Sequence, residues 1–253
     1  MNSIRATSLT KRYGDTTAVD SLDLTVPNGI VYGFLGPNGA GKTTTMRMLT
    51  TLIRPTSGQA FVGGESITDR NAVTTHIGYL PEEPPLYPEL TAYEQLDYAA
   101  GLRDIATPET TNRIETLLDR LDLTGDADDR IVGYSKGMRQ KTAFIQAILH
   151  DPDVLFLDEP TSGLDPRSAR TVRDIIIELT NNGTTVFLST HILPIVDELA
   201  DTVGVLFDGQ LITEGSPAEL KRRAESGEQD TLEDVFLEVT DDESAFEGES
   251  NDA

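Results

Sequence analysis

A glycine-rich loop of eight residues constrains this chain more than any other feature. It matches the pattern Gly-x-x-x-x-Gly-Lys-Ser/Thr in full and reads Gly36-Pro37-Asn38-Gly39-Ala40-Gly41-Lys42-Thr43. Residues 30–35 form an apolar run that predicts a buried strand before the loop, and residues 44–52 predict a helix after it, beginning at Thr44. Glycine lets backbone N–H groups turn inward around phosphate oxygens, where a Cβ would clash, and the helix N-terminus adds partial positive charge. We therefore expect a bound nucleotide, with Lys42 at its β- and γ-phosphates and the Thr43 hydroxyl on Mg²⁺.

The rest of the pattern predicts an α/β protein. Short apolar or alternating runs predict strands at residues 4–9, 22–26, 59–62, 77–80, 154–157 and 185–189, and a hairpin at 203–213. Helical spacing predicts helices at residues 93–102, 109–121, 137–150 and 167–180. Strands that alternate with helices imply a parallel sheet. The antiparallel N-terminal strands and the helical middle are then additions to this sheet.

The charge of the chain excludes one class of partner. The net charge is −23, and residues 224–253 carry twelve acidic and no basic side chains, which leaves −11 for the rest. Such a surface repels phosphates, so we expect no nucleic-acid partner. Only five of the twenty basic residues are lysine. An acidic surface with little lysine suits a high-salt cytoplasm, because salt screens its self-repulsion, and it favours a halophilic source.

Several further features favour a cytoplasmic location. The chain has no cysteine, so it forms no disulfide framework. Its first residues lack the apolar region of a secretory signal, and no run approaches eighteen apolar residues. We expect the nucleotide-binding domain to span residues 1–217 and a helical extension to span 218–240, where Leu232, Val235, Phe236 and Val239 have helical spacing. Residues 241–253 are acidic and predicted to be disordered.

Two carboxylates follow the apolar run at residues 154–157. Asp158 ends the predicted strand and Glu159 comes directly after it. In proteins with a phosphate loop such a strand lies beside the loop, so Asp158 can hold Mg²⁺ through its waters. Glu159 is then placed to polarise a water for in-line attack on the γ-phosphate. Without the loop, a solvated strand end would be the simpler interpretation.

A third motif opens the helix predicted at residues 137–150. Ser135 is a good N-cap, and the segment reads Tyr-Ser-Lys-Gly-Met-Arg-Gln-Lys over residues 134–141. By itself this pattern indicates only a helix cap. Its surroundings give it more weight, because the chain resembles the ATP-binding cassette (ABC) ATPases over residues 3–217. The motifs that carry the resemblance follow one another in family order: Tyr13, the phosphate loop, the signature at 134–140, Asp158-Glu159, Ser162-Gly163-Leu164-Asp165 and His191.

The resemblance implies a fold and an assembly. The fold would be a P-loop NTPase (RecA-like) parallel-sheet core with an N-terminal antiparallel β-subdomain and an inserted α-helical subdomain at about residues 84–150. Ser135 and Gly137 would bind the γ-phosphate of ATP held by a second copy, which makes the active unit a head-to-tail dimer around two ATP molecules. Tyr13 would stack on adenine, although a structural tyrosine at a strand edge is the alternative. Asp165 would lie in the loop that crosses the interface, and His191 would touch the γ-phosphate.

The chain departs from the family pattern at two places. The usual signature is Leu-Ser-Gly-Gly-Gln, and here Tyr134, Lys136 and Met138 replace its first, third and fifth residues. Lys136 adds attraction for an anion. The family also carries a glutamine on the loop between the two lobes, and alignment around Leu86-Tyr87-Pro88 places Glu82, or alternatively Glu83, at that position. A carboxylate there would ligate Mg²⁺ or orient water.

These departures, together with residues 231–238, look like the exporter-type branch of the family. The chain would then be the motor of an exporter, held at the cytoplasmic face of the membrane by a separate permease subunit. The other readings are a non-transport ABC ATPase and a nucleotide-binding regulatory module without significant hydrolysis. A GTPase is disfavoured because no Asn-Lys-x-Asp motif occurs, and a double-cassette protein is disfavoured because there is a single phosphate loop.

Overall fold

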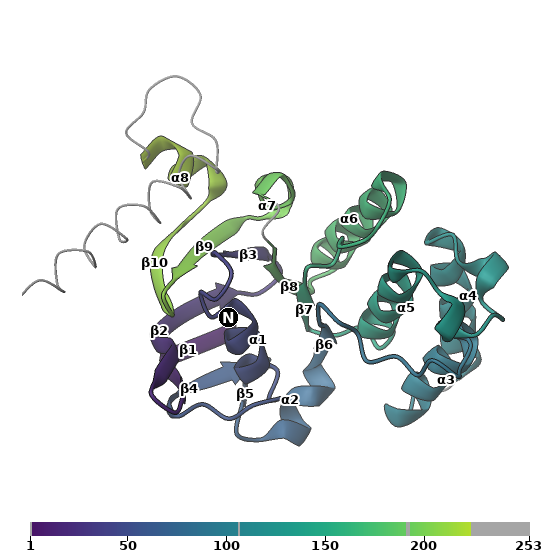
Figure 1. Cartoon of the computed structure of the whole chain (residues 1–253), viewed down its shortest axis with the longest axis horizontal. Coiled ribbons are helices and arrows are strands. Elements are labelled where there is room, and N and C mark those ends of the chain that lie inside the picture. The colour runs from purple at the N-terminus through teal and green to yellow at the C-terminus, as the bar shows by residue number, and fades with distance from the viewer. Residues whose placement is uncertain (1, 106, 191–192, 224–253) are drawn as a thin grey trace, which may run out of the picture.

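The computed structural model describes residues 2–105, 107–190 and 193–223, which form two sheets and a group of helices (Figure 1). The smaller sheet is antiparallel and has the order β2-β1-β4-β5. Its strands are β1 (Asn2–Tyr13), β2 (Thr16–Pro27), β4 (Ser57–Val62) and β5 (Glu65–Ser66). The first two strands extend well beyond the predicted ranges, because charged and hydroxyl residues continue the alternation past the apolar runs.

The larger sheet is the core and has the order β10-β9-β3-β8-β7-β6. Its strands are β3 (Val31–Leu35), β6 (Ile77–Leu80), β7 (Val154–Asp158), β8 (Thr185–Ser189), β9 (Thr202–Phe207) and β10 (Gln210–Gly215). Each pairing is parallel except that of β9 with β10. Every residue of β3, β7 and β8 is buried, which explains why these strands are nearly continuous apolar runs.

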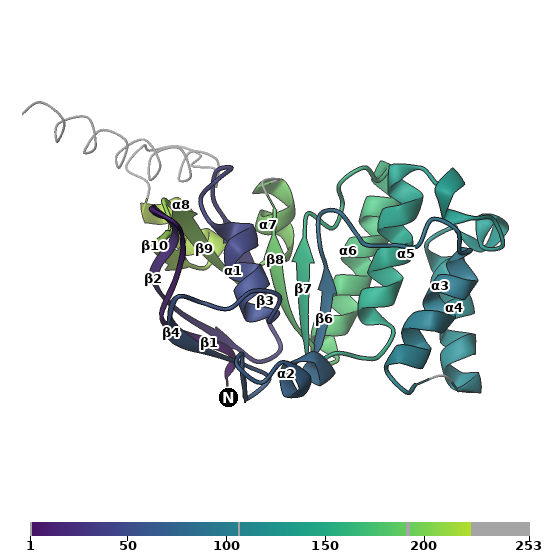
Figure 2. The ribbon, with the colours of Figure 1, turned by 60° about the horizontal axis from the view of Figure 1, so that its bottom comes forward.

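The two faces of this sheet enter two different cores. Along β7, Val154 and Phe156 belong to a cluster with the antiparallel sheet and α1 (Lys42–Leu49), whereas Leu155 and Leu157 belong to a cluster with the helices. This alternation follows from the two-residue period of a strand. Figure 2 shows β8, β7 and β6 side by side between α1 and the helices α5 (Lys136–Ile148) and α6 (Pro166–Asn181).

The helical part lies between β6 and β7 in the sequence and to one side of the core sheet in space (Figure 1). It contains α3 (Ala92–Leu102), α4 (Pro108–Arg120), α5 and two short 3-10 turns, η1 (Thr124–Asp126) and η2 (Ile131–Gly133). Thr91 and Glu94 form a reciprocal capping box at the start of α3, and Ser135 caps α5 as its sequence predicts. These helices begin and end close to the predicted positions.

Two short helices, α2 (Arg70–His76) and α7 (Leu193–Leu199), were not predicted from the sequence. Each has seven residues, too few for a periodic pattern to stand out. A third short helix, α8 (Pro217–Arg223), lies at the start of the helical extension expected at 218–240. The helix after the phosphate loop ends at Leu49, three residues before the predicted end, and Thr51 there takes a left-handed conformation. The proposed helix with Leu232, Val235, Phe236 and Val239 and the acidic tail at 241–253 lie outside the described residues.

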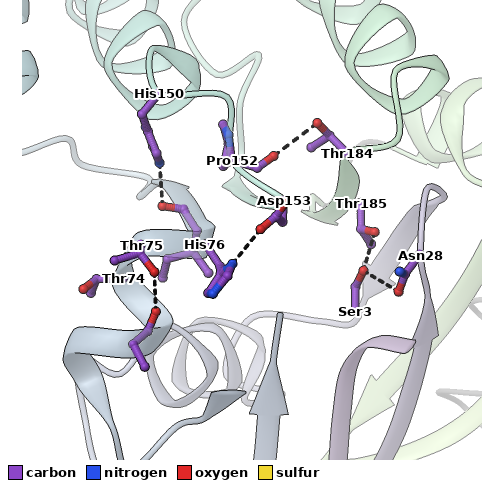
Figure 3. Close-up of polar contacts among 12 residues, drawn as sticks. Ser3, Asn28, Thr74, Thr75, His76, His150, Pro152, Asp153, Thr184 and Thr185 are labelled. Atoms are coloured by element: carbon purple, nitrogen blue, oxygen red, sulfur yellow. Dashed lines mark hydrogen bonds and ion pairs between the residues drawn. The ribbon is translucent and has the colours of Figure 1, made fainter. Parts of the chain in front are cut away.

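Polar contacts tie the amino ends of the core strands together (Figure 3). The Ser3 hydroxyl lies 2.7 Å from the Thr185 hydroxyl and donates to Asn28 Oδ1 at 2.9 Å. His76 Nδ1 lies 2.6 Å from Asp153 Oδ2, next to the start of β7. These contacts join the antiparallel sheet and α2 to the core sheet. The phosphate loop and Asp158 take no part in them, since they lie at the opposite, carboxyl ends of β3 and β7.

Candidate nucleotide-binding site

The phosphate loop joins the end of β3 to the start of α1, as the sequence predicts. Gly41 has φ of +104°, and a Cβ at this position would lie 2.3 Å from the Ala18 carbonyl oxygen. Gly36 is equally crowded, because its Cβ would lie 2.3 Å from the Leu206 carbonyl oxygen. Two of the motif's glycines are therefore required by the packing of the loop against β2 and β9. Lys42 closes the loop on itself, since its Nζ donates to the carbonyl oxygens of Gly36 and Pro37 at 2.6 and 3.0 Å.

A cleft of about 330 Å³ opens over this loop. Thr43 and Asp158 meet in it, with the Thr43 hydroxyl 3.3 Å from Asp158 Oδ2. They meet because β3 and β7 flank β8 in the sheet, so the loop after one strand lies beside the end of the other. The residues that line the cleft are Leu35, Gly36, Pro37, Asn38, Lys42, Thr43, Glu82, Asp158, Glu159, Thr190 and Leu193.

Three carboxylates face one lysine in this cleft. Burial raises the pKa of Asp158, hydrogen bonds with Ser189 and Thr43 oppose this shift, and the charges of Glu82 and Glu159 add to it. Burial lowers the pKa of Lys42, and the charges of Glu159, Asp158 and Glu82 oppose that shift. The lining residues thus carry an excess of negative charge next to the loop that is built for phosphate. A cation between the carboxylates and the phosphates would relieve this repulsion.

The donors in the cleft fit Mg²⁺ when a nucleotide is present. Within residues 2–105, 107–190 and 193–223, no group of three or more His, Cys, Asp or Glu side chains could hold a metal by itself. Mg²⁺ does not require such a cage, because it is usually bound by one or two carboxylates together with substrate phosphates and waters. The Thr43 hydroxyl and the Asp158 carboxylate are oxygen donors of this kind, side by side at the edge of the phosphate loop.

Glu159 has an unusual backbone conformation, with φ of +50°. A non-glycine residue there costs on the order of 1 kcal/mol or more, and its neighbours must hold it in place. Its N–H donates to the Ser189 carbonyl at 2.8 Å, and its side-chain Oε2 accepts from the Thr190 hydroxyl at 2.9 Å. The side chain is thus directed into the cleft, where it lines the wall.

The structure distinguishes between the two glutamates proposed for the linking loop. Glu82 lines the phosphate cleft with Asp158 and Glu159. Glu83 points elsewhere and lines a neighbouring groove with Arg47 and Leu86. Of these two glutamates, Glu82 is therefore the one placed beside the phosphate loop.

Other predicted site residues lie outside the cleft. Tyr13 is 50% exposed at the end of β1, and the Lys11 ammonium lies 5.0 Å from its ring centroid. Ser135 accepts from the Met138 N–H as the N-cap of α5, and Lys136 donates to the Ser162 hydroxyl at 2.9 Å. The cleft is likewise not lined by Gly39, Ala40, Gly41, Thr44 or Gly137.

Asp165 caps α6, and its carboxylate accepts from the N–H groups of Arg167 and Ser168 at 3.0 Å. The Ser168 hydroxyl and N–H lower the pKa of Asp165 to about 2. Within its own chain Asp165 is therefore a helix cap. His191 lies outside the described residues.

Two residues at the site were missed by sequence reasoning. Thr190 contacts the Glu159 carboxylate, and Gln140 Nε2 donates to the Glu159 carbonyl oxygen at 3.1 Å. Thr190 follows directly after a buried strand, so its position at a strand end was a signal that could have been used. Gln140 is the last residue of the signature segment 134–140, but its contact with Glu159 depends on how α5 packs against the end of β7.

Comparison with known proteins accounts for this arrangement. A family model described as ABC transporter matches residues 19–162. The chain belongs to the ABC transporter family. It is 45% identical over 220 residues to the daunorubicin/doxorubicin resistance ATP-binding protein DrrA of Streptomyces peucetius, with 86% of this chain and 66% of that protein covered. It is 40% identical over 222 residues to the bacitracin transport ATP-binding protein BcrA of Bacillus licheniformis, with 87% and 72% covered. This chain thus spans about two thirds of the length of these relatives.

Solved structures show the same cassette fold. One, described as the ATP-binding subunit of an ABC transporter, has a TM-score of 0.87 and 28% identity, with 93% of this chain and 98% of that chain covered. A dimeric ATP-binding cassette bound to ADP and Pi has a TM-score of 0.78 and 23% identity, with 84% and 98% covered. The chain thus has the fold of an ATP-binding cassette. No helix in the described part of this ABC protein is long and apolar enough to cross a bilayer.

Proposed function

We propose that this chain is the ATP-hydrolysing motor of a membrane exporter and works as a head-to-tail dimer around two ATP molecules. The observation that carries the proposal is the division of the predicted site. The phosphate loop, Asp158 and Glu159 share one cleft. Ser135 and Gly137, which resemble the family signature, lie outside it at the start of α5. A second copy that supplies its Ser135 helix tip would complete each site.

Within each site, the residues take the following proposed roles. The loop 36–43 and Lys42 bind the phosphates, and Tyr13 stacks on adenine. Thr43 and Asp158 hold Mg²⁺, which would neutralise charge on the β- and γ-phosphates. Glu159 accepts a proton from the attacking water, and its carboxylate is held for that task by the Thr190 hydroxyl.

The remaining predicted residues complete the proposed site. Glu82 orients water or adds a ligand to Mg²⁺, and it lines the cleft together with Asp158 and Glu159. His191 touches the γ-phosphate, and Asp165 lies in the loop that crosses to the partner. Since Asp165 also caps α6, its replacement would affect both the interface and the helix.

An exposed apolar surface supports the proposed contact with a permease. Two grooves meet at Leu52, one lined also by Leu102 and Arg103 and the other by Leu86. Leu52 is 47% exposed and Leu102 is 69% exposed. Tyr87 and Tyr98 are exposed on the same helical part, with their rings edge to face at 5.6 Å. Exposed apolar side chains gathered around a groove are typical of a protein-binding surface, and we assign it to a cytoplasmic loop of the permease.

The dimer is tested with the Glu159→Gln variant, which should bind ATP and fail to turn it over. Light scattering after size exclusion should give the mass of two chains with ATP and of one chain with ADP. Adding Ser135→Arg, which places a bulky cation at the contact, should return the ATP form to one chain. Particles that stay single at every ATP concentration would refute the dimer, and near-normal hydrolysis by Glu159→Gln would refute the role of Glu159.

Transport coupling is tested separately. Where a gene beside this one encodes a hydrophobic membrane protein, co-expression of the two should yield a complex. Leu102→Asp should weaken that complex while the melting temperature of the chain stays the same. A wild-type chain that hydrolyses no ATP, alone or in the complex, would favour the regulatory module instead. A chain that hydrolyses ATP but forms no complex with any membrane protein would favour a non-transport ATPase.

A further inference from the structure

A buried glutamine links the signature helix to Glu159. Gln140 lies on the second turn of α5, and its side chain is 1% exposed. Its Nε2 donates to the backbone carbonyl oxygen of Glu159 at 3.1 Å. Nothing in the proposed chemistry uses Gln140, because it does not line the ATP cleft. Its contact is with the main chain of the residue proposed as general base.

Glu159 depends on such contacts for its orientation. Its φ of +50° belongs to the left-handed region, which side chains other than glycine rarely adopt. On one side its N–H is held by the Ser189 carbonyl of β8 at 2.8 Å. On the other side its carbonyl accepts from Gln140 and from the Ser162 N–H, the latter at 3.0 Å. The peptide that leaves Glu159 is therefore oriented jointly by its own turn and by α5.

The same helix contacts the next residues of this segment. Lys136 Nζ donates to the Ser162 hydroxyl at 2.9 Å. A Cβ on Gly137 would lie 2.8 Å from the Gly163 carbonyl oxygen, so the first turn of α5 and the segment after Glu159 are in close contact. Ser135 caps this turn. One helix thus carries Ser135 at its tip and holds residues 159–163 along its side.

We propose that Gln140 is a positioning residue that aims the Glu159 carboxylate at the water in its own ATP site. It would do so by fixing the carbonyl of Glu159 and with it the left-handed turn. This inference rests on the proposed function and extends that function. When Ser135 docks on the partner's ATP, any movement of α5 would also move Glu159, the general base of the same chain. The two ATP sites of the dimer would then be coupled through one hydrogen bond in each chain.

The test replaces Gln140 with methionine, which keeps the length of the side chain and removes the donor. Because small misplacements of a catalytic group cost up to about a hundredfold, we expect kcat for ATP hydrolysis by the full chain to fall by about ten- to a hundredfold. KM should change by less than about twofold, since no ATP contact is lost. Gln140→His, whose Nε2 reaches to a similar point, should recover most of kcat. If Gln140→Met melts below the assay temperature, Gln140→Ala takes its place.

Thr142→Val is the matched control. Thr142 lies on the same helix and is fully buried, and its hydroxyl donates to Met138 within the helix at 2.9 Å. In the described part of the chain, this hydroxyl makes no hydrogen bond to residues 158–165. Thr142→Val should therefore keep wild-type kcat. If it loses as much as Gln140→Met, the effect is a general disturbance of α5 and the inference fails.

A double-mutant cycle with Glu159→Gln gives the decisive result. A residue that acts only through Glu159 should cause no further loss when Glu159 is already disabled, as measured by slow single-turnover hydrolysis. Wild-type kcat in Gln140→Met would overturn the inference, and so would a loss of ATP affinity or an additional loss in the Glu159→Gln background. Failure of the proposed function is recognised differently, by Glu159→Gln itself hydrolysing ATP normally.

Discussion

Replacing His150 with glutamine should remove an acid-sensitive element from the fold. The ring Nε2 lies 2.9 Å from the Ile77 carbonyl oxygen, and the buried Nδ1 has no hydrogen-bond partner among the described residues. Burial, followed by the charge of Arg103, lowers the pKa of His150 from 6.5 to about 4, although the Ile77 hydrogen bond and the charge of Asp151 oppose this shift. Protonation would add an N–H at the buried Nδ1, which has no acceptor among the described residues. It would also place a positive charge near the Arg103 guanidinium. Glutamine is the natural replacement because its amide can donate to the same carbonyl and does not titrate.

The sign and size follow from linkage between protonation and folding. Above pH 6.5 both the native and the unfolded states hold a neutral His150, so its contribution to the free energy of unfolding is fully present. As the pH falls from 6.5 to about 4, the unfolded chain takes up a proton that the native chain refuses, and stability is lost. At pH 5 the difference amounts to about 2 kcal/mol, and partial exposure of the ring reduces it to roughly 1–2 kcal/mol.

Urea denaturation of wild type and His150→Gln at about pH 7.5 and about pH 5 measures this difference. Both chains should lose stability in acid because carboxylates in other parts of the fold also titrate. The wild type should lose about 1–2 kcal/mol more than the variant, since only it carries the buried imidazole. Parallel losses in the two chains would refute the reasoning and would mean that the ring accepts a proton in the native state.

Three further predictions concern the loop, the core and a helix cap. Gly36→Ala should weaken binding of a fluorescent ATP analogue about tenfold or more, because the added Cβ would lie 2.3 Å from the Leu206 carbonyl oxygen. Normal affinity would contradict this expectation. Phe187 packs at 5.0–5.6 Å against three other rings, so Phe187→Ala should lower the free energy of unfolding by about 3–5 kcal/mol, and a loss below about 1 kcal/mol in urea titration would show that the cavity collapses. Thr91→Ala removes one half of the capping box with Glu94 and should cost about 1 kcal/mol by the same titration; an unchanged midpoint would argue against the cap.

Much of the fold could be predicted from the sequence because its main elements are strongly periodic. The apolar run at β7 and the helical spacing of α5 are each produced by one local pattern, so their positions follow from short stretches. Short elements such as α2 could not be predicted, since seven residues carry too little periodicity. The sequence also left the choice between Glu82 and Glu83 open, because two neighbouring glutamates fit the same motif position and only their side-chain directions differ.

For this ABC protein, the sequence by itself determined the phosphate loop, the carboxylates Asp158 and Glu159 at the end of the β7 run, and the order of the family motifs. These are local features, set by residue types at fixed spacing. Only the tertiary structure decided which strands are neighbours, that Glu82 faces the cleft, and that Gln140 holds the carbonyl of Glu159 across nineteen residues of sequence. The physical reason is that such contacts arise when separate elements pack together, and packing is decided by the whole buried surface rather than by any one stretch of the chain.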